Sequence, residues 1–261
     1  MSEATEPYAV FHRLGGEDLR GHVILIHGFG ADRLSWLANA PELFDTFGVW
    51  GVDLPGHGDA EPLRGAVSLG SLADAVIAGL GGATHGPIQI VGHSLGGAIA
   101  LEVAERIPGH VRSISLIAPA GLGKGINGDF IASFAGLRDV DGALELLQRL
   151  VARPRLINKQ MASRVVAHLE RPGRRAAMAS AAESLRRIEA DLVGALTAIH
   201  RNGIPHMTIW GEADRINPLD RDRLAEFGGE QHIVPTAGHM PQIEDFKAVN
   251  GWLKAFLIAH S

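Results

Sequence analysis

The sequence has no cysteine, which excludes disulfide bonds, thiolate metal ligands and cysteine nucleophiles. It has no apolar run of 18 residues, the length that a membrane-spanning helix needs, so we expect no membrane insertion. It also has no run of five or six like charges, and its 24 basic and 29 acidic residues give a formal charge of −5. Nucleic acid is therefore not expected as a partner.

The composition is that of an ordinary soluble globular protein. Hydrophobic residues make up 46% of the 261 residues and charged residues 20%, so the chain can bury a sizeable core. Residues 1–7 are acidic and polar and lack the apolar segment of a secretion signal, which favours a cytoplasmic location. Two short basic clusters, at 171–175 and 186–187, are predicted to lie on solvated helix faces.

Short apolar runs alternate with amphipathic stretches along most of the chain. The runs lie at residues 23–26, 49–52, 87–91, 114–117, 206–210 and 232–234, and they are typical of buried parallel strands. Helical patterns lie between them, at 71–79, 97–107 and 245–259. This alternation predicts an α/β fold with a mostly parallel twisted sheet and helices on both of its faces.

One long interval, residues 121–200, has no strand pattern. It is rich in Ala, Leu, Arg and Glu, with apolar residues at three- and four-residue spacing in 140–151, 155–168 and 174–188. We therefore predict a helical cap, or lid, at 121–200, inserted into a core made of residues 1–120 and 201–261. A cap in this position would line the approach to the site and decide substrate size.

The strongest local motif is Gly92-His-Ser94-Leu-Gly96, which follows an apolar strand and precedes a helix. This is the context of a nucleophile elbow, in which a serine lies on a sharp strand-to-helix turn. Glycines two residues before and after the serine avoid collisions in so tight a turn. We therefore predict Ser94 as a catalytic nucleophile.

A serine nucleophile needs a base, and the base needs an acid that orients it. Asp214 follows the strand at 206–210 and His239 follows the strand at 232–234, so both come after Ser94 and just past strand ends. The order Ser, Asp, His is that of α/β-hydrolase triads. Each residue alone is a weak signal, but the ordered set predicts His239 as base and Asp214 as acid.

Acyl transfer also needs two N–H donors for the oxyanion. The Leu95 amide is the first, and the Phe29 amide, flanked by Gly28 and Gly30 after an early strand, is the expected second. Gly28 is predicted to shape that turn. The Asp53-Leu-Pro-Gly-His57 segment precedes Ser94, so its polar side chains are expected to bond within their own loop. No metal-ligand spacing such as HExxH occurs, and we expect neither a metal nor a cofactor.

With these residues placed, the chain resembles the α/β-hydrolase superfamily over nearly its whole length. Within that superfamily, residues 26–30, 117–123 and 237–244 are similar to the hydrolase-like domain of proteins named acetoin dehydrogenase E2 subunit, or dihydrolipoyllysine-residue acetyltransferase. Such proteins often carry a lipoyl domain with its lysine in an Asp-Lys-Ala turn. This sequence has no Asp-Lys-Ala, so we do not expect it to carry acyl groups on lipoate.

The predicted function is therefore that of a serine hydrolase acting on a small carboxylic ester or related acyl substrate through an acyl-enzyme. One alternative is a C–C bond hydrolase of the meta-cleavage product type, which residues 120–123 resemble, although His93 and Met240 replace the Asn and Trp common there. Another is an acyltransferase-like or non-catalytic component associated with an acetoin dehydrogenase complex. A binding protein that keeps the fold, and a homo-oligomer, also stay open.

Overall fold

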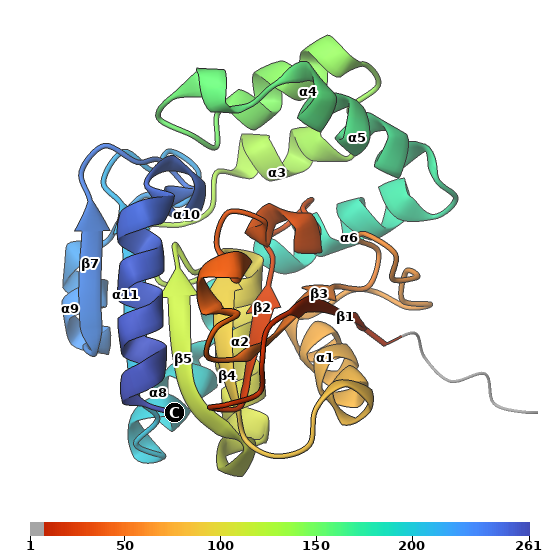
Figure 1. Ribbon diagram of the computed structural model, residues 1–261. Coiled ribbons are helices and arrows are strands. Elements are labelled where there is room, and N and C mark those ends of the chain that lie inside the picture. Colours follow the sequence, from red (N-terminus) through yellow and green to blue (C-terminus); the bar gives the residue numbers. More distant parts are fainter. Residues whose placement is uncertain (1–7) are drawn as a thin grey trace, which may run out of the picture.

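Seven strands form one twisted sheet in the computed structural model, which describes residues 8–261 (Figure 1). Their order is β1-β3-β2-β4-β5-β6-β7, with β1 antiparallel to β3 and every other pair parallel. The strands are β1 (Val10–Gly15), β2 (His22–Ile26), β3 (Gly48–Asp53), β4 (Ile88–His93), β5 (Val111–Ile117), β6 (His206–Gly211) and β7 (Glu230–Val234). The six predicted strands and the mostly parallel α/β fold are confirmed; β1 is an edge strand that the sequence did not reveal.

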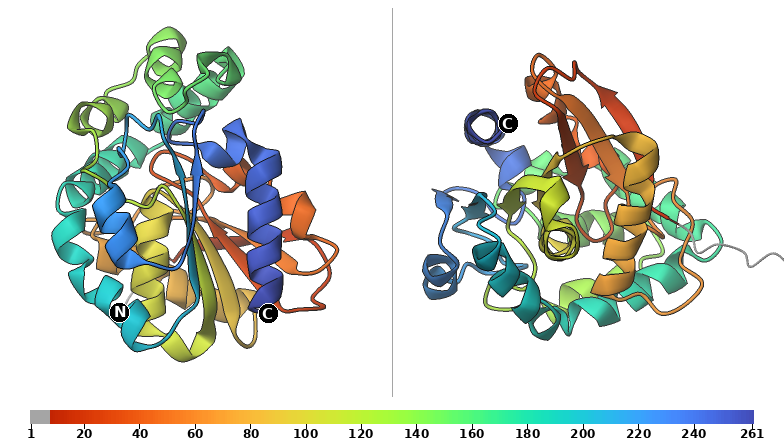
Figure 2. Two further views of the ribbon diagram at one scale, coloured as in Figure 1. Left: turned by 90° about the vertical axis from the view of Figure 1, so that its left-hand side faces the viewer. Right: turned by 90° about the horizontal axis from the view of Figure 1, so that it is seen from below.

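Alternate residues of the strands build two separate hydrophobic layers. In β2, Ile24 and Ile26 belong to one cluster of buried side chains, and Val23 and Leu25 belong to the other. Figure 2 shows helices on both sides of the sheet. The first layer contains α1 (Leu69–Ala83), α2 (Leu95–Arg106), α8 (Val193–Arg201) and α9 (Arg221–Phe227), and the second contains η1 (Arg33–Trp36), η2 (Ala40–Leu43) and α11 (Phe246–Ala259).

All of the regular secondary structure between β5 and β6 is helical. It forms α3 (Gly128–Phe134), α4 (Val140–Gln148), η4 (Pro154–Leu156), α5 (Lys159–Glu170), α6 (Arg174–Leu185), α7 (Ile188–Asp191) and α8. The side chains of Asn127, Asp139 and Asn158 cap the first turns of α3, α4 and α5. Figure 1 shows these three helices beyond the carboxyl ends of the strands, whereas α8 packs against α2 beside the sheet.

Long polar side chains of α5 and α6, and of the turn between them, join these helices to the loop after β3. They donate hydrogen bonds to three carbonyl groups of that loop: His168 to Gly56, Arg171 to Gly58 and Arg174 to Ala60. Arg174 is only 1% exposed, so the predicted solvated face is wrong at this residue. Its charge is tolerated there because the guanidinium bonds to the Ala60 carbonyl and lies 3.7 Å from the Glu61 carboxylate.

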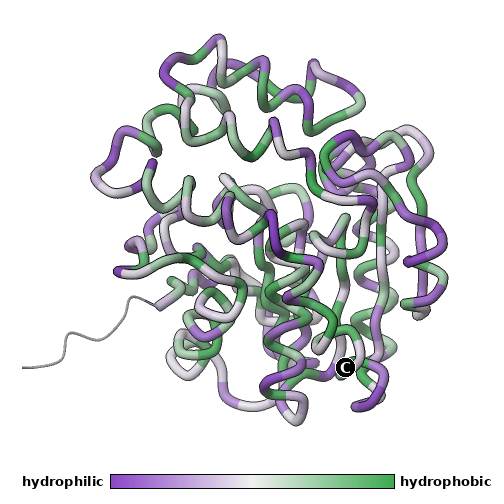
Figure 3. Tube along the Cα trace, turned by 180° about the vertical axis from the view of Figure 1, so that it is seen from behind, coloured by the Kyte–Doolittle hydropathy of each residue, from purple (hydrophilic) through white to green (hydrophobic). Residues whose placement is uncertain are grey.

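The hydropathy of the chain follows this architecture. In Figure 3, hydrophobic segments run through the strands and hydrophilic segments recur on the outer turns of the helices. Among residues 8–261, none of the helices combines the length and the apolar character that crossing a bilayer requires. The polar start predicted for residues 1–7 lies outside the described residues.

Candidate active site

Ser94 lies on the turn between β4 and α2, and its backbone is strained. Its φ of 52° and ψ of −114° are unusual for a residue other than glycine. The turn is held by neighbouring backbone groups, because the Ser94 N–H donates to the Ile117 carbonyl at 2.9 Å and the Ser94 carbonyl accepts from Gly97 and Ala120.

The glycines that flank the serine are explained by close backbone contacts. A Cβ at Gly92 would overlap the Gly96 carbonyl, and a Cβ at Gly96 would overlap the Ile26 carbonyl of β2. A Cβ at Gly28 would lie 2.9 Å from Nδ1 of His93 and 3.2 Å from Cβ of Ser94. These three glycines allow the strand, the helix and the loop after β2 to converge on Ser94.

His239 and Asp214 lie in the loops after β7 and β6, and their side chains meet. Nδ1 of His239 lies 2.7 Å from Oδ2 of Asp214, and both side chains are buried. The other oxygen of Asp214 accepts the N–H groups of Ile216 at 2.8 Å and Asn217 at 2.9 Å. A carboxylate only accepts hydrogen bonds, so Nδ1 of His239 carries a proton, and in the neutral ring Nε2 has the free lone pair.

The Phe29 and Leu95 amides, the expected oxyanion donors, have no acceptor among residues 8–261. Leu95 is the first residue of α2, where helical N–H groups have no partner within the helix. The end of the helix dipole adds positive potential at this point. Both amides are therefore free to bind an anion.

Two buried histidines hold the loop that contains Phe29. His27 accepts the Leu54 N–H at Nε2, 3.2 Å away, and its Nδ1 lies 2.8 Å from the Gly28 carbonyl. His57 accepts the Gly30 N–H at Nε2 and its Nδ1 bonds to Pro55, each at 3.1 Å. Burial lowers the pKa of His57 well below its ordinary value. His57 thus bonds within its own loop, as expected, and also reaches the Phe29 loop, which the sequence did not indicate.

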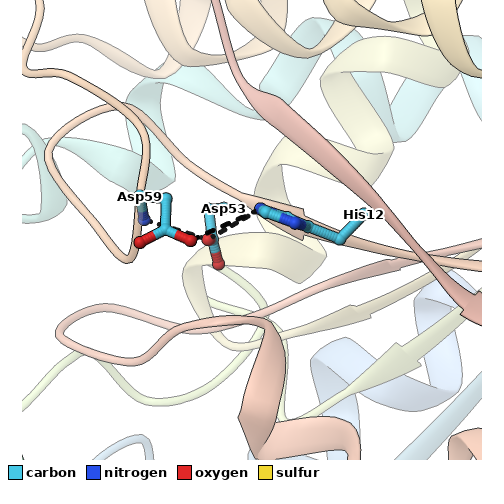
Figure 4. A group of neighbouring side chains, drawn as sticks. All are labelled: His12, Asp53 and Asp59. Carbon is cyan, nitrogen blue, oxygen red and sulfur yellow. Dashed lines mark hydrogen bonds and ion pairs between the residues drawn. The ribbon is translucent and has the colours of Figure 1, made fainter.

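His12, Asp53 and Asp59 form a cluster with the ligand types of a metal site (Figure 4). A cation is already present, because the Arg33 guanidinium pairs with Asp53 and lies 3.0 Å from Oδ2 of Asp59. Burial raises the pKa of Asp53, but the N–H groups of Arg33 and Asp59 with nearby positive charges lower it overall. We therefore interpret the cluster, together with Arg33, as an ion-pair network that joins the segment after β2 to the loop after β3.

Ser94 and His239 line one pocket of about 40 Å³, the space of only a few water molecules. Its polar lining side chains are those of Ser94, His239 and His93. Burial, with a smaller effect of His239, lowers the pKa of His93 to about 3. The lining contains neither Asp, Glu, Lys nor Arg, and part of it comes from the helical insertion: Ile126, Phe130, Ile131, Leu150 and Leu185.

Comparisons with known proteins agree with this architecture. A family model described as "Alpha/beta hydrolase family" matches residues 23–252. The dihydrolipoyllysine-residue acetyltransferase component of the acetoin cleaving system of Pseudomonas putida is 33% identical over 95% of this chain and 66% of that protein. This chain thus spans slightly less than two thirds of that relative.

Two further relatives are similar over nearly their whole lengths. A pimeloyl-[acyl-carrier protein] methyl ester esterase of Neisseria meningitidis is 30% identical, over 90% of this chain and 93% of the esterase. A meta-cleavage product hydrolase from Pseudomonas fluorescens superposes with a TM-score of 0.84 at 24% identity, covering 99% of this chain and 98% of that one. The chain belongs to the alpha/beta hydrolase family of enzymes.

Proposed function

We propose that the chain is a serine hydrolase that cleaves a small, uncharged carboxylic ester through an acyl-enzyme on Ser94. The observation that supports this most is that Ser94 and His239 line the same pocket, with Asp214 2.7 Å behind His239. A nucleophile, a base and an orienting acid in this order form a catalytic triad.

In the proposed reaction, Nε2 of His239 takes the Ser94 proton while Oγ of Ser94 attacks the ester carbonyl. The Phe29 and Leu95 amides stabilise the oxyanion, and the tetrahedral intermediate collapses as His239 returns the proton to the leaving alcohol. Water, deprotonated by His239, then attacks the acyl-enzyme. The acid leaves and Ser94 regains its proton. Asp214 keeps the ring oriented and stabilises the imidazolium in both steps.

The proposed substrate class follows from the pocket lining. Without Lys or Arg in that lining, a buried carboxylate on the acyl group would lack a partner, and such burial is costly. The small volume favours a short acyl chain. We also propose that the cap predicted at residues 121–200 is formed by the part of that range that precedes α8, because the five lining residues lie there and α8 packs beside the sheet.

Labelling with a fluorophosphonate probe and hydrolysis of short p-nitrophenyl esters test the proposal. We expect the wild-type protein to be labelled and active, and Ser94→Ala to lose both properties. Ser115→Ala is a matched control, because its buried hydroxyl has no partner among the described residues and does not line the pocket. Full esterase activity in Ser94→Ala would refute the proposed mechanism, and turnover of ring-cleavage products without esters would favour C–C hydrolysis.

The relatives of the acetoin cleaving system support a second candidate, an acyl-transferring or docking component of a dehydrogenase complex. The 33% identity over 95% of this chain is the observation in its favour. Co-purification with a dehydrogenase complex, and acyl transfer to dihydrolipoamide faster than to water, would support it. Ester hydrolysis by the isolated chain at the same rate with and without the thiol would count against it.

A further inference from the structure

Glu244, the last residue of α10 (Pro241–Glu244), is a buried carboxylate that the proposed reaction does not use. Its Oε1 accepts the Gly238 N–H at 2.5 Å. Its Oε2 accepts the N–H groups of Ala152 at 2.9 Å and Arg153 at 3.3 Å. Burial raises the pKa of Glu244, and these three donors oppose that effect. A buried carboxylate needs such partners, so the three amides, together with Nε of Arg153 at 3.9 Å from Oε2, account for its presence.

The three donors come from two segments that are far apart in the sequence. Gly238 immediately precedes His239, whereas Ala152 and Arg153 belong to the chain between α4 and η4 in the helical insertion. Each oxygen of Glu244 binds one of these segments, so the side chain bridges them.

The two segments also touch directly. The His239 N–H donates to the Leu150 carbonyl at 2.8 Å. A Cβ at Gly238 would lie 2.8 Å from the Ala152 nitrogen, closer than real Cβ atoms approach another atom, and a tight 3.0 Å from the Leu150 oxygen. Glycine at 238 is therefore required by the close approach of the insertion to the His239 loop.

We propose that Glu244 is a positioning residue that fixes the His239 loop to the insertion segment 150–153 and so holds the His239 ring against Asp214. The role rests on the proposed function, because it matters for catalysis only if His239 is the base. The carbonyl of His239 is held on its other side by Nε2 of His93 at 2.8 Å. With Glu244 and Leu150 on one side and His93 on the other, the backbone on both sides of the ring is fixed.

The bridge has a consequence for the insertion. Because segment 150–153 is bonded to the base loop, it cannot move away without displacing His239. Any opening that admits substrate must therefore leave this segment in place. Leu150 itself lines the pocket, so the segment is a fixed part of the pocket wall.

The variant Glu244→Gln tests the role. Glutamine keeps the length of the side chain but presents an NH2 group to one of the two sets of N–H donors, so one segment is released. We expect kcat for short p-nitrophenyl esters to fall by roughly 10- to 100-fold, with KM nearly unchanged, because a displaced base weakens the chemical step more than binding. The downfield proton resonance of the His239 Nδ1–H should broaden or disappear, and amide exchange at 150–153 and 238–239 should accelerate together.

A control and a second variant keep the outcome decisive. Asn250→Ala removes a buried polar group of α11 that bonds to Asn39 and to the Ala38 carbonyl, away from the pocket. It should lower stability without changing kcat. Glu244→Asp keeps the charge but shortens the reach, and it replaces the Gln variant if that variant does not fold.

Two results would overturn the role: unchanged kcat with an intact His239 resonance, or a loss of kcat no larger than that of Asn250→Ala. The failure of the proposed function gives a different result. In that case the wild-type chain hydrolyses no ester and is not labelled at Ser94, while the coupled amide exchange of the two segments still responds to Glu244→Gln.

Discussion

Asp214 divides its two oxygens between His239 and the backbone: Oδ2 bonds to Nδ1 of the ring, and Oδ1 accepts the Ile216 and Asn217 amides. The two amides hold the Asp214 carboxylate in place independently of its bond to the His239 ring. The Asn217 side chain in turn donates to the carbonyls of Ala118 and Pro119 after β5. Asp214 is therefore a rigid support for the His239 ring.

The variant Asp214→Asn should lose turnover and keep its fold. An amide at this position can offer its NH2 group to Nδ1 and so favour the wrong tautomer of His239, which lowers kcat by about 10³- to 10⁴-fold in comparable triads. Steady-state kinetics on p-nitrophenyl esters, with circular dichroism to check the fold, measure this. Asp220→Asn, at the cap of α9, is the control and should leave kcat unchanged. An undiminished rate in Asp214→Asn would assign the acid role to another residue.

The acceptor at Nε2 of His57 should matter for turnover. His57→Leu leaves the Gly30 N–H without its partner and loosens the loop that presents the Phe29 amide, so we expect kcat to fall by about 10- to 100-fold. His57→Gln places an oxygen near the same position and should recover most of the rate. Equal losses in the two variants would show that the hydrogen bond is not the cause.

Acid should destabilise the protein partly through His93. Its pKa lies at about 3 in the fold because of burial, against 6.5 for an ordinary histidine. The unfolded chain therefore binds a proton that the folded chain rejects, so this contribution to stability is complete above pH 6.5 and is lost as the pH falls from 6.5 toward 3. Urea denaturation measures the free energy of unfolding at each pH in this range. Its increase with pH should be about 1.4 kcal/mol per pH unit smaller in His93→Gln than in the wild-type protein.

Buried His27 and His57 also have lowered pKa values, so a pH dependence remains in the His93→Gln variant. The comparison with wild type isolates the share of His93. Parallel stability curves for the two proteins would mean that His93 does not reject its proton in the fold.

The insertion should set the acyl-chain preference. Leu185→Ala on α6 removes part of the pocket lining, so kcat/KM should shift toward longer esters while overall stability falls by about 2–5 kcal/mol. Leu169→Ala on α5 is equally buried but does not line this pocket. It should cost similar stability and leave the preference among p-nitrophenyl esters unchanged. A shift of the same size in both variants would point to general loosening.

Much of the fold was predictable because its signals are local. The runs within β2 to β6 are short and mostly apolar, as strands buried on both faces must be, and β7 keeps a shorter apolar end. β1 was not predicted because the polar residues His12 and Arg13 lie in its middle and none of its side chains is fully buried. The elbow around Ser94 was visible because its glycines lie within two residues of the serine.

The supports of the site were less predictable because their partners are distant in the chain. Glu244 and Ala152 are 92 residues apart, and His57 and Gly30 are 27 residues apart. Nothing in the sequence around Glu244 distinguishes it from an ordinary helix residue. The burial of Arg174 depends in the same way on a carbonyl 114 residues earlier in the chain.

The bonds from His168, Arg171 and Arg174 to Gly56, Gly58 and Ala60 also bear on engineering. Grafting the insertion of another hydrolase onto this core would leave three backbone acceptors without donors within the loop that contains His57. A transplanted cap would thus have to supply three long donor side chains at matching positions, whatever its own pocket lining. Chimeras that keep residues 168–174 from this chain should be the ones that retain the conformation of the loop that contains His57.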